Sequence, residues 1–326
     1  MTTSRGVAGE PRQHASAGQT ARRSFMELLR ARWEVAGTLL CVGLDPELER
    51  LPETIRTGGD SAASREGNDG TQAGAKRIEQ AILAFNTAIV DATADLVCAF
   101  KPNSAFYEAH GPAGLRALLR TIAYLHDRYP NIPVILDAKR GDIGSTSAAY
   151  ARAAFDVAGA DAVTLQPYLG RDALAPFLDR ADRGCLILCR TSNPRAGELQ
   201  DLLVAAGPDG TPLPLYQVVA RAVAERWNTN GNCALVVGAT YPDELRTVRG
   251  IVGDMPMLVP GIGAQGGDLE ATLDAGLDSR GQGLIISASR SVLYASAGPD
   301  FAQAARTETL RLHDAIDQPR RSRRGH

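Results

Sequence analysis

Two acidic side chains and one basic side chain lie close together near the middle of the sequence: Asp137, Lys139 and Asp142. They follow the apolar run 132–136, whose β-branched residues and short length are typical of a strand buried on both faces. Because side chains on a strand alternate between its two sides, Asp137 and Lys139 should project to the same side. Gly141 allows a sharp turn that brings the Asp142 carboxylate back toward the lysine. The sequence therefore predicts an ammonium group between two carboxylates at the end of a strand.

Such a set of side chains could hold a lysine in its charged form for electrostatic stabilisation or proton transfer. Taken alone, the pattern is more typical of an exposed ion pair at a strand terminus. Ser145 or Thr146 can cap a helix that follows the turn. The choice between a site and a surface ion pair depends on what the rest of the chain places nearby.

Strand-like and helix-like segments alternate along most of the chain. The predicted strands are 38–44, 96–100, 132–136, 162–165, 185–189, 233–237, 257–259 and 284–286; the predicted helices are 76–94, 113–128, 146–158, 171–180, 215–227, 242–249, 268–275 and 300–315. Repeated βα units favour one α/β fold, a closed (β/α)8 TIM barrel, because parallel strands need crossovers and a closed sheet leaves no unpaired edge. An open doubly wound sheet is the alternative.

Further polar side chains fall at or just past the C-terminal ends of the predicted strands. They are Asp45, Lys101, Thr191, Ser192, Gln265 and Arg290, in addition to Asp137 and Lys139. In (β/α)8 enzymes the active site is built from the loops at this end of the barrel. We therefore expect these residues to surround a single site.

The chain outside the barrel pattern divides into a few segments. Residues 1–20 lack hydrophobic periodicity and are expected to be disordered, and the barrel is expected over 21–317. Phe25, Leu28, Leu29 and Trp33 predict an N-terminal amphipathic helix that covers one end of the core. Residues 57–75, rich in Gly, Ser and Asp, predict a mobile insertion, and the basic tail 318–326 is expected to be disordered.

Composition narrows the classes of partner. The 326-residue chain has 44% hydrophobic residues and a formal net charge of -2, which gives no reason to expect a nucleic-acid or membrane partner. No apolar segment approaches the length of a spanning helix, and the first residues lack the apolar core of a secretory signal, so a cytoplasmic protein is expected. Five cysteines in apolar runs favour small buried hydrophobes over disulfides, and the histidines show no metal-ligand spacing.

Several motifs in a fixed order resemble those of the orotidine 5'-phosphate decarboxylase family, from about Leu39 to Leu293. VGLDP contains Asp45 and FKPN contains Lys101; the pattern Asp-x-Lys-x-x-Asp-Ile-x-x-Thr is matched at Asp137, Lys139, Asp142, Ile143 and Thr146; CRTSNP contains Thr191 and Ser192; PGIGAQGGD contains Gln265; and SASRS contains Arg290. FKPNSAFYE, LQPYLG and the loop 194–213 resemble the branch of the family called type 2, and the roles of Asn103 and Gln166 stay open.

The resemblance implies a role for each matched residue. Asp45 and Lys101 would contact the ribose region, Thr191 or Ser192 the pyrimidine, and Gln265 and Arg290 the phosphate, while Ile143 and Thr146 would complete the substrate-binding set. The glycines around Gln265 suit a lid, and a forked guanidinium suits a phosphate dianion.

The resemblance also implies the reaction. It is a metal-free and cofactor-free decarboxylation of orotidine 5'-phosphate to UMP and CO2, in which Lys139 stabilises and protonates a carbanion at C6. Asp137 and Asp142 would hold the lysine. Family members are homodimers in which the second aspartate reaches the partner's site, so Asp142 is expected to act there.

Two other functions fit parts of the pattern. Hexulose-phosphate synthases and ketogulonate-phosphate decarboxylases reuse the Asp-x-Lys-x-x-Asp arrangement with Mg²⁺, although the AQGGD segment and the hydroxyl pair at 191–192 favour a pyrimidine substrate. A phosphosugar or nucleotide sensor without turnover is the alternative from a different class, and the complete acid–lysine–acid set disfavours it.

Overall fold

A parallel eight-stranded sheet forms the centre of the protein. The computed structural model describes residues 23–57, 72–205, 210–262 and 268–324, with side chains through residue 320. The sheet strands are β1 (Leu40–Leu44), β2 (Ala99–Pro102), β3 (Ile135–Arg140), β4 (Ala162–Leu165), β5 (Gly184–Arg190), β8 (Cys233–Val237), β9 (Met257–Pro260) and β10 (Leu284–Ala288). Their order is β2-β1-β10-β9-β8-β5-β4-β3, and all the pairings along it are parallel.

The two ends of this sheet meet, so the sheet forms a nearly closed barrel. Two isolated parallel bridges, Phe100 with Val134 and Asn103 with Asp137, join β2 to β3. This confirms the predicted (β/α)8 TIM barrel over the open sheet. All eight predicted strands are present, with boundaries shifted by a few residues.

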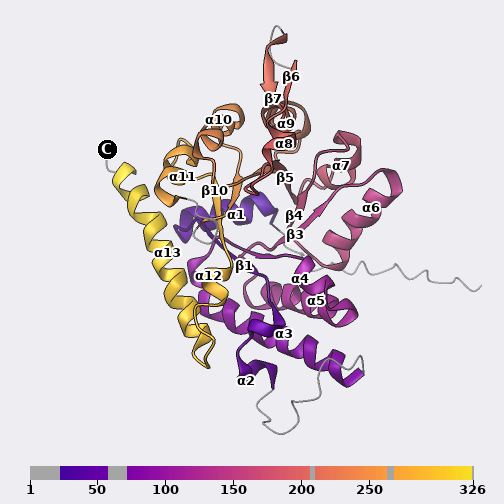
Figure 1. The fold of residues 1–326 in the computed structure, drawn as a ribbon, viewed down its shortest axis with the longest axis vertical. Helices are drawn as coiled ribbons and strands as arrows, with labels where there is room; N and C mark the ends of the chain where they lie inside the picture. The colour runs from indigo at the N-terminus through magenta and orange to yellow at the C-terminus, as the bar shows by residue number, and fades with distance from the viewer. Residues whose placement is uncertain (1–22, 58–71, 206–209, 263–267, 325–326) are drawn as a thin grey trace, which may run out of the picture.

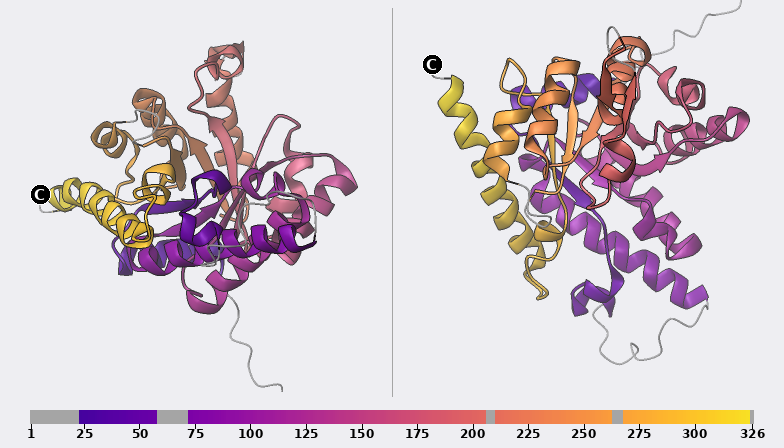
Figure 2. Two further views of the ribbon diagram at one scale, coloured as in Figure 1. Left: turned by 60° about the horizontal axis from the view of Figure 1, so that its bottom comes forward. Right: turned by 45° about the horizontal axis from the view of Figure 1, so that its top comes forward.

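Helices surround the barrel on its outer side (Figures 1 and 2). They are α2 (Glu53–Arg56), α3 (Gln72–Thr93), α4 (Ala105–Glu108), α5 (Gly111–Arg128), α6 (Gly144–Arg152) with its π-helical extension Ala153–Val157, α7 (Arg171–Leu178), α9 (Leu215–Ala222) with its π-helical extension Val223–Trp227, α10 (Pro242–Val252), α11 (Leu269–Gly276), α12 (Arg290–Leu293) and α13 (Phe301–Arg324), together with the 3₁₀ turns Leu48–Arg50 and Ala94–Leu96. Helix α6 begins at Gly144 without a side-chain cap, so the predicted cap at Ser145 or Thr146 is wrong.

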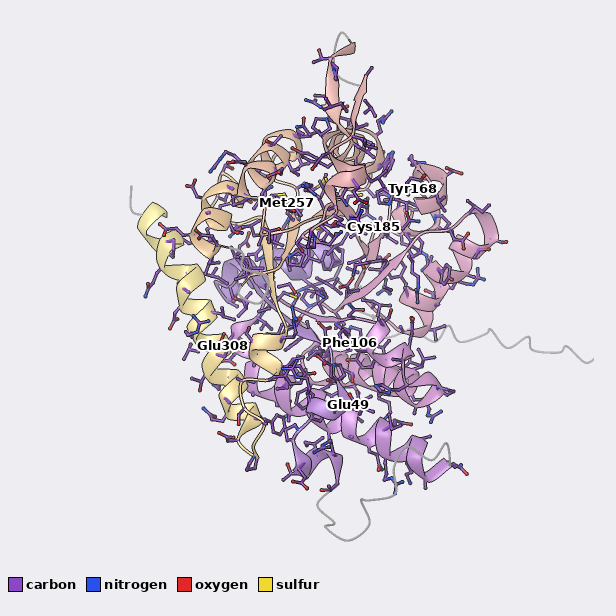
Figure 3. The ribbon with its side chains drawn as sticks, viewed as in Figure 1. Glu49, Phe106, Tyr168, Cys185, Met257 and Glu308 are labelled. Carbon is purple, nitrogen blue, oxygen red and sulfur yellow. The ribbon has the colours of Figure 1, made fainter. Side chains whose placement is uncertain are left out.

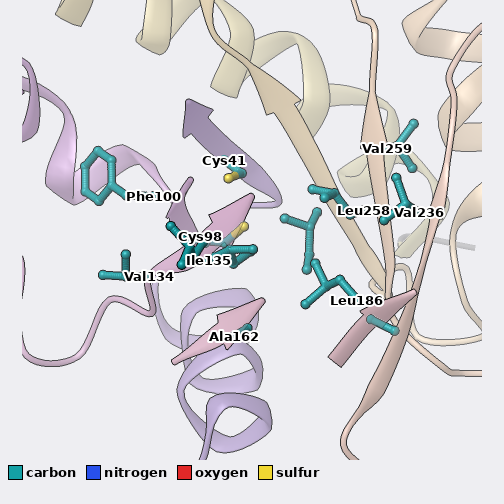
Figure 4. Packing of buried hydrophobic residues seen from close by; sticks show 14 of the residues in the cluster. Cys41, Cys98, Phe100, Val134, Ile135, Ala162, Leu186, Val236, Leu258 and Val259 are labelled. Atoms are coloured by element: carbon teal, nitrogen blue, oxygen red, sulfur yellow. The ribbon is translucent and has the colours of Figure 1, made fainter. Parts of the chain in front are cut away.

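The strands and the inner faces of the helices form one continuous apolar core. β1 and β8 are buried along their whole length, which explains why their sequences are nearly uniformly apolar. Figure 4 shows Cys41 and Cys98 among the packed side chains of neighbouring strands. All five cysteines are buried and free, as predicted, and burial raises the pKa of the Cys41 thiol to about 12.

The N-terminal helix α1 (Phe25–Val35) covers one end of the core, as predicted, and lies at the N-terminal ends of the barrel strands. Ser24 and Glu27 form a capping box that satisfies its first N–H groups. Phe25 and Trp33 are buried, and Phe25 donates its backbone N–H to Asp182 O, shortly before β5. Arg32 donates to Val97 O before β2, so this helix links the starts of two distant strands.

The C-terminal helix continues further than predicted. α13 extends to Arg324, so the disordered tail expected from residue 318 is wrong for the first part of that segment. Arg320 is only 2% exposed; it donates to Gly37 O over 2.6 Å and to Gly281 O over 2.9 Å. A guanidinium that satisfies loop carbonyls can be buried with its long aliphatic stem, which composition alone did not indicate.

The loop expected at 194–213 contains regular structure. It includes α8 (Gly197–Gln200) and an antiparallel pair, β6 (Leu203–Ala205) with β7 (Pro212–Pro214), that projects beyond the barrel at the top of Figure 1. Residues 1–20 and most of the predicted insertion 57–75 lie outside the described residues, and positions 72–75 begin α3. Among the described helices, none has the length and apolar character needed to cross a membrane.

Candidate active site

A cavity of about 900 Å³ opens at the C-terminal ends of the barrel strands. Its lining includes seven of the predicted site residues: Asp45, Lys101, Asp137, Lys139, Thr191, Ser192 and Arg290. They come from the ends of β1, β2, β3, β5 and β10, which are distant in sequence and converge because parallel strands all end at the same rim. The structure thus brings seven of the eight residues expected at the strand ends together around one cavity.

Asp137 stands at the centre of the charged groups. Its Oδ1 accepts from Lys139 Nζ over 2.7 Å and from the Thr164 hydroxyl over 2.8 Å, and its Oδ2 accepts from Lys101 Nζ over 2.9 Å. Lys101 and Asp137 are buried, whereas the Lys139 side chain is 50% exposed. The Lys101 ammonium is thus buried inside the protein, and the Lys139 ammonium extends into the cavity.

The backbone at Lys139 departs from an ordinary strand. Lys139 has a φ of 47°, and among the described residues it is the one non-glycine with positive φ. A left-handed conformation costs such a residue of the order of 1 kcal/mol or more, and it persists when surrounding contacts hold it. Here the Thr164 hydroxyl accepts from the Lys139 backbone N–H over 2.9 Å, and the β3–β4 register shifts between Leu136 and Arg140. Asp137 and Lys139 do meet, as predicted, but through this distorted strand end.

The charges shift one another's pKa values. Burial acts to raise the pKa of Asp137, but Lys101 and Lys139 together hold that pKa well below the ordinary value of a carboxyl group. Burial likewise acts to lower the pKa of Lys101, and Asp137 with Asp45 raises it above its ordinary value. Both groups of the buried pair therefore stay ionised at neutral pH.

Two tyrosines fix the loop that carries Asp45. The buried Tyr107 hydroxyl donates to Leu44 O over 2.8 Å, and the Tyr294 hydroxyl donates to Asp45 O over 3.1 Å while it accepts from the Glu47 N–H over 2.7 Å. The Asp45 carboxylate then accepts from the backbone N–H of Asn103 over 3.2 Å. These bonds hold the half-buried carboxylate at the rim of the cavity.

Thr191 and Ser192 both line the cavity, but the protein already engages the Thr191 hydroxyl. That hydroxyl accepts from Gln200 Nε2 over 2.8 Å and donates to Asn193 Oδ1 over 2.7 Å. Ser192 packs so tightly against Gly238 that a Cβ there would lie 2.7 Å from the Ser192 Cβ.

Arg290 is exposed at the start of α12 and lines the cavity. The preceding Ser289 lies against Gly43, where an added Cβ would approach its hydroxyl to 1.8 Å, so only glycine at 43 permits this approach of β10 to β1. Gln265 lies outside the described residues.

Three predicted residues are absent from the cavity lining: Asp142, Ile143 and Thr146. The Asp142 carboxylate accepts from the Ile143 backbone N–H over 2.7 Å, and Ile143 is 62% exposed. Among the described residues, Asp142 does not line the cavity, and its carboxylate forms no ion pair with Lys139.

Several residues that line the cavity could not be assigned to it from the sequence. Thr164 lies in β4, where a hydroxyl inside the apolar segment AVTL was the one available signal. Gln200 ends the short helix α8, in a segment that was expected to be a loop. Phe106 follows the FKPN motif and lies near the middle of Figure 3, whereas Tyr168, 77% exposed, lies further out.

Comparisons with known proteins identify the family to which this chain belongs. The family model described as "Orotidine 5'-phosphate decarboxylase / HUMPS family" matches residues 38–306. The orotidine 5'-phosphate decarboxylases of Janthinobacterium sp. (strain Marseille) and Cellvibrio japonicus (strain Ueda107) are each 50% identical to this chain; the matches cover 90% and 91% of it, and 98% and 99% of those relatives. The solved structure of Leishmania donovani OMP decarboxylase is 37% identical with a TM-score of 0.71, and the match covers 90% of this chain and 98% of that one. The chain belongs to the orotidine 5'-phosphate decarboxylase / HUMPS family.

Proposed function

We propose that this protein is an orotidine 5'-phosphate decarboxylase, a carbon–carbon lyase that converts orotidine 5'-phosphate to UMP and CO2. The observation that carries the proposal is the half-exposed ammonium of Lys139, bonded to the buried Asp137 at the floor of a cavity that also holds Asp45 and Arg290. The relatives that match nearly the whole chain carry this name, which supports the same activity here.

The proposed reaction uses the lysine twice. The bond between C6 and the carboxylate carbon breaks, CO2 leaves, and the electron pair stays on C6. The Lys139 ammonium stabilises this negative charge and then transfers a proton to C6, which gives UMP and a neutral amine that regains its proton from water. Asp137 and Lys101 fix the position of the lysine.

Asp137 can also favour loss of the substrate carboxylate. Two negative charges about 4 Å apart repel by ~4 kcal/mol at an effective dielectric near 20, and departure of CO2 relieves that repulsion. Known enzymes lower activation barriers by about 8–23 kcal/mol, so positioning and transition-state stabilisation must supply the larger share.

The remaining lining residues suit the other parts of the substrate. Arg290 at the rim would bind the phosphate dianion, with Gln265 as its expected partner. Asp45 and Lys101 would face the ribose. Binding energy from these distant groups would stabilise the reacting conformation and thus accelerate the chemical step.

A homodimer would complete the site. The apolar side chains Ile143, Tyr168 and Leu169 are 62%, 77% and 43% exposed and follow β3 and β4 at the site end of the barrel. β3 and β4 are neighbours in the sheet, and large exposed apolar patches typically mark interfaces. We infer that a second copy covers them and that Asp142, next to Ile143, enters the partner's site.

The decisive assay follows the absorbance change as orotidine 5'-phosphate is converted, in buffer with and without EDTA. Turnover that survives EDTA supports the proposal. Turnover that requires added Mg²⁺ would instead favour the chemistry of the hexulose-phosphate synthases, and binding without turnover would favour a sensor. Within the described residues, no three His, Cys, Asp or Glu side chains are grouped as metal ligands.

A further inference from the structure

The side chain of Ser287 is a buried polar group without a protein partner. Ser287 lies in β10, a strand that is otherwise apolar, and it is 7% exposed. Its side chain lines the cavity, and within the described part of the chain its hydroxyl forms no hydrogen bond. Buried hydroxyl groups in folded proteins are nearly always paired. The partner of the Ser287 hydroxyl must therefore be a molecule inside the cavity, which is water in the free protein and a ligand in the complex.

Thr38 shows how the fold treats a buried hydroxyl that supports structure alone. It lies just before β1 and is 1% exposed. Its hydroxyl donates to Leu96 O over 2.8 Å and accepts from the Leu40 backbone N–H over 3.1 Å. Ser287 has no such partners, and a buried hydroxyl that the protein leaves unpaired does not stabilise the fold. The hydroxyl at 287 is therefore better explained by binding than by folding.

The strands beside Ser287 indicate which part of a nucleotide its hydroxyl meets. Ser287 pairs with Cys41 of β1 on one side and with Pro260 of β9 on the other. β1 ends directly before Asp45, and β10 ends shortly before Arg290. Since strand residues advance by about 3.3 Å each, Ser287 lies roughly 10 Å further down the strand than Arg290. Ser287 is thus below both the residue expected at the ribose and the residue expected at the phosphate.

The oxygens of a ribose differ in the partner that each requires. The hydroxyl groups carry protons and can donate to the Asp45 carboxylate, which only accepts. The ring oxygen carries no proton, so it needs a donor from the protein. The Ser287 hydroxyl is a donor that no described protein group engages, and it lines the cavity between β1 and β9. Its chemistry therefore complements that of Asp45.

We propose that Ser287 is a further substrate-binding residue, which donates its hydroxyl proton to the ring oxygen of the ribose. The inference rests on the proposed function, which places the ribose at Asp45 and the phosphate at Arg290, and it adds a contact beneath the sugar. In the free protein the hydroxyl bonds to water, and the ribose oxygen takes the place of that water on binding.

Calorimetric titration of the full chain with UMP, ribose 5-phosphate and inorganic phosphate tests the contact. Ser287→Ala removes one neutral hydrogen bond, so UMP and ribose 5-phosphate should each bind about three- to tenfold more weakly than to the wild type. Inorganic phosphate has no sugar, and its affinity should stay unchanged. This pattern assigns the hydroxyl to the ribose, because a contact to the base would spare ribose 5-phosphate and a contact to the phosphate would not spare inorganic phosphate.

Urea unfolding of the free protein separates binding from folding. Ser287→Ala removes a hydroxyl that bonds to no protein group, so its unfolding midpoint should equal or exceed that of the wild type. Thr38→Val is the matched control, since it removes a buried hydroxyl that the protein does engage. The control should lower the unfolding midpoint and leave the affinity for UMP unchanged.

Each result has a distinct meaning. Weaker binding of UMP and ribose 5-phosphate by a Ser287→Ala protein of undiminished stability supports the contact. Unchanged affinity for UMP overturns it, as does a lowered unfolding midpoint with unchanged affinity. Weaker binding of inorganic phosphate overturns the assignment to the ribose. A wild type that binds UMP and loses affinity on Ser287→Ala, but never converts orotidine 5'-phosphate, overturns the proposed function and not this contact.

Discussion

Lys101 Nζ and Asp137 Oδ2 lie 2.9 Å apart, and the two side chains are only 6% and 10% exposed. They come from β2 and β3, the two strands that only isolated bridges join. The ion pair therefore ties the least regular junction of the barrel together beneath the reactive lysine.

Removal of Lys101 should destabilise the fold more than removal of the reactive lysine. Lys101→Met leaves the buried Asp137 carboxylate with one ammonium, and breaking a buried pair costs about 3–5 kcal/mol. Lys139→Met removes a half-exposed partner and should cost well under half as much. Urea unfolding of both variants measures the difference; equal losses would contradict a structural role for the Lys101 pair.

The buried pair also predicts how stability depends on pH. The pKa of Asp137 is lower in the folded protein than in the unfolded chain, where it is about 3.9. The ionised Asp137 carboxylate therefore contributes fully to the free energy of unfolding above about pH 4–5. This contribution is lost as the pH falls toward the pKa of Asp137 in the folded protein. The free energy of unfolding of wild type minus that of Asp137→Asn should be constant from about pH 5 to 8 and shrink below about pH 4. A difference that grows in acid would contradict the ionised pair.

Thr164 should matter for both stability and turnover, because its hydroxyl holds the Asp137 carboxylate and the Lys139 backbone N–H. Thr164→Val keeps the shape of the side chain but leaves the Asp137 carboxylate and the Lys139 backbone N–H each without this hydrogen-bond partner. The free energy of unfolding should fall by about 1–3 kcal/mol. We expect a lower kcat with little change in KM, since the phosphate contacts stay intact. Thr164→Ser is the matched control and should retain most of the activity. A Thr164→Val variant as active as the wild type would show that the Thr164 hydroxyl has no role in turnover.

The proposed exchange of Asp142 between subunits predicts complementation. Lys139→Ala and Asp142→Ala proteins should each be inactive, and a hybrid dimer of the two contains one site with both residues intact. Mixing them should restore activity up to about a quarter of the wild-type level, because half of the dimers are hybrids and each has one complete site. No recovery after proven subunit exchange would show that Asp142 acts within its own chain or not at all.

The sequence predicted those features that depend on local pattern. Strand periodicity and the polar residues at strand ends located the barrel and most of the cavity lining, because parallel strands bring their ends together regardless of distance along the chain. The resemblance to the family added the expected role of each residue.

Features that depend on tertiary partners were not predictable in the same way. The left-handed backbone of Lys139 requires the Thr164 hydroxyl from a neighbouring strand. Burial of Arg320 requires two loop carbonyls that are distant in sequence. Because the sequence does not reveal these partners, the basic composition of residues 318–326 indicated a solvated tail. Gln200 lies in a segment whose Gly and Pro content predicted an irregular loop, and only the structure places its amide against Thr191.

The central claim is that the Lys139 ammonium stabilises and protonates C6 of the substrate. The most direct measurement is kcat for decarboxylation of orotidine 5'-phosphate by Lys139→Met, with UMP affinity and circular dichroism measured on the same sample. We predict a folded protein that still binds UMP and has lost at least about 10⁴-fold in kcat. A folded variant that retains more than about a tenth of the wild-type kcat would contradict the claim.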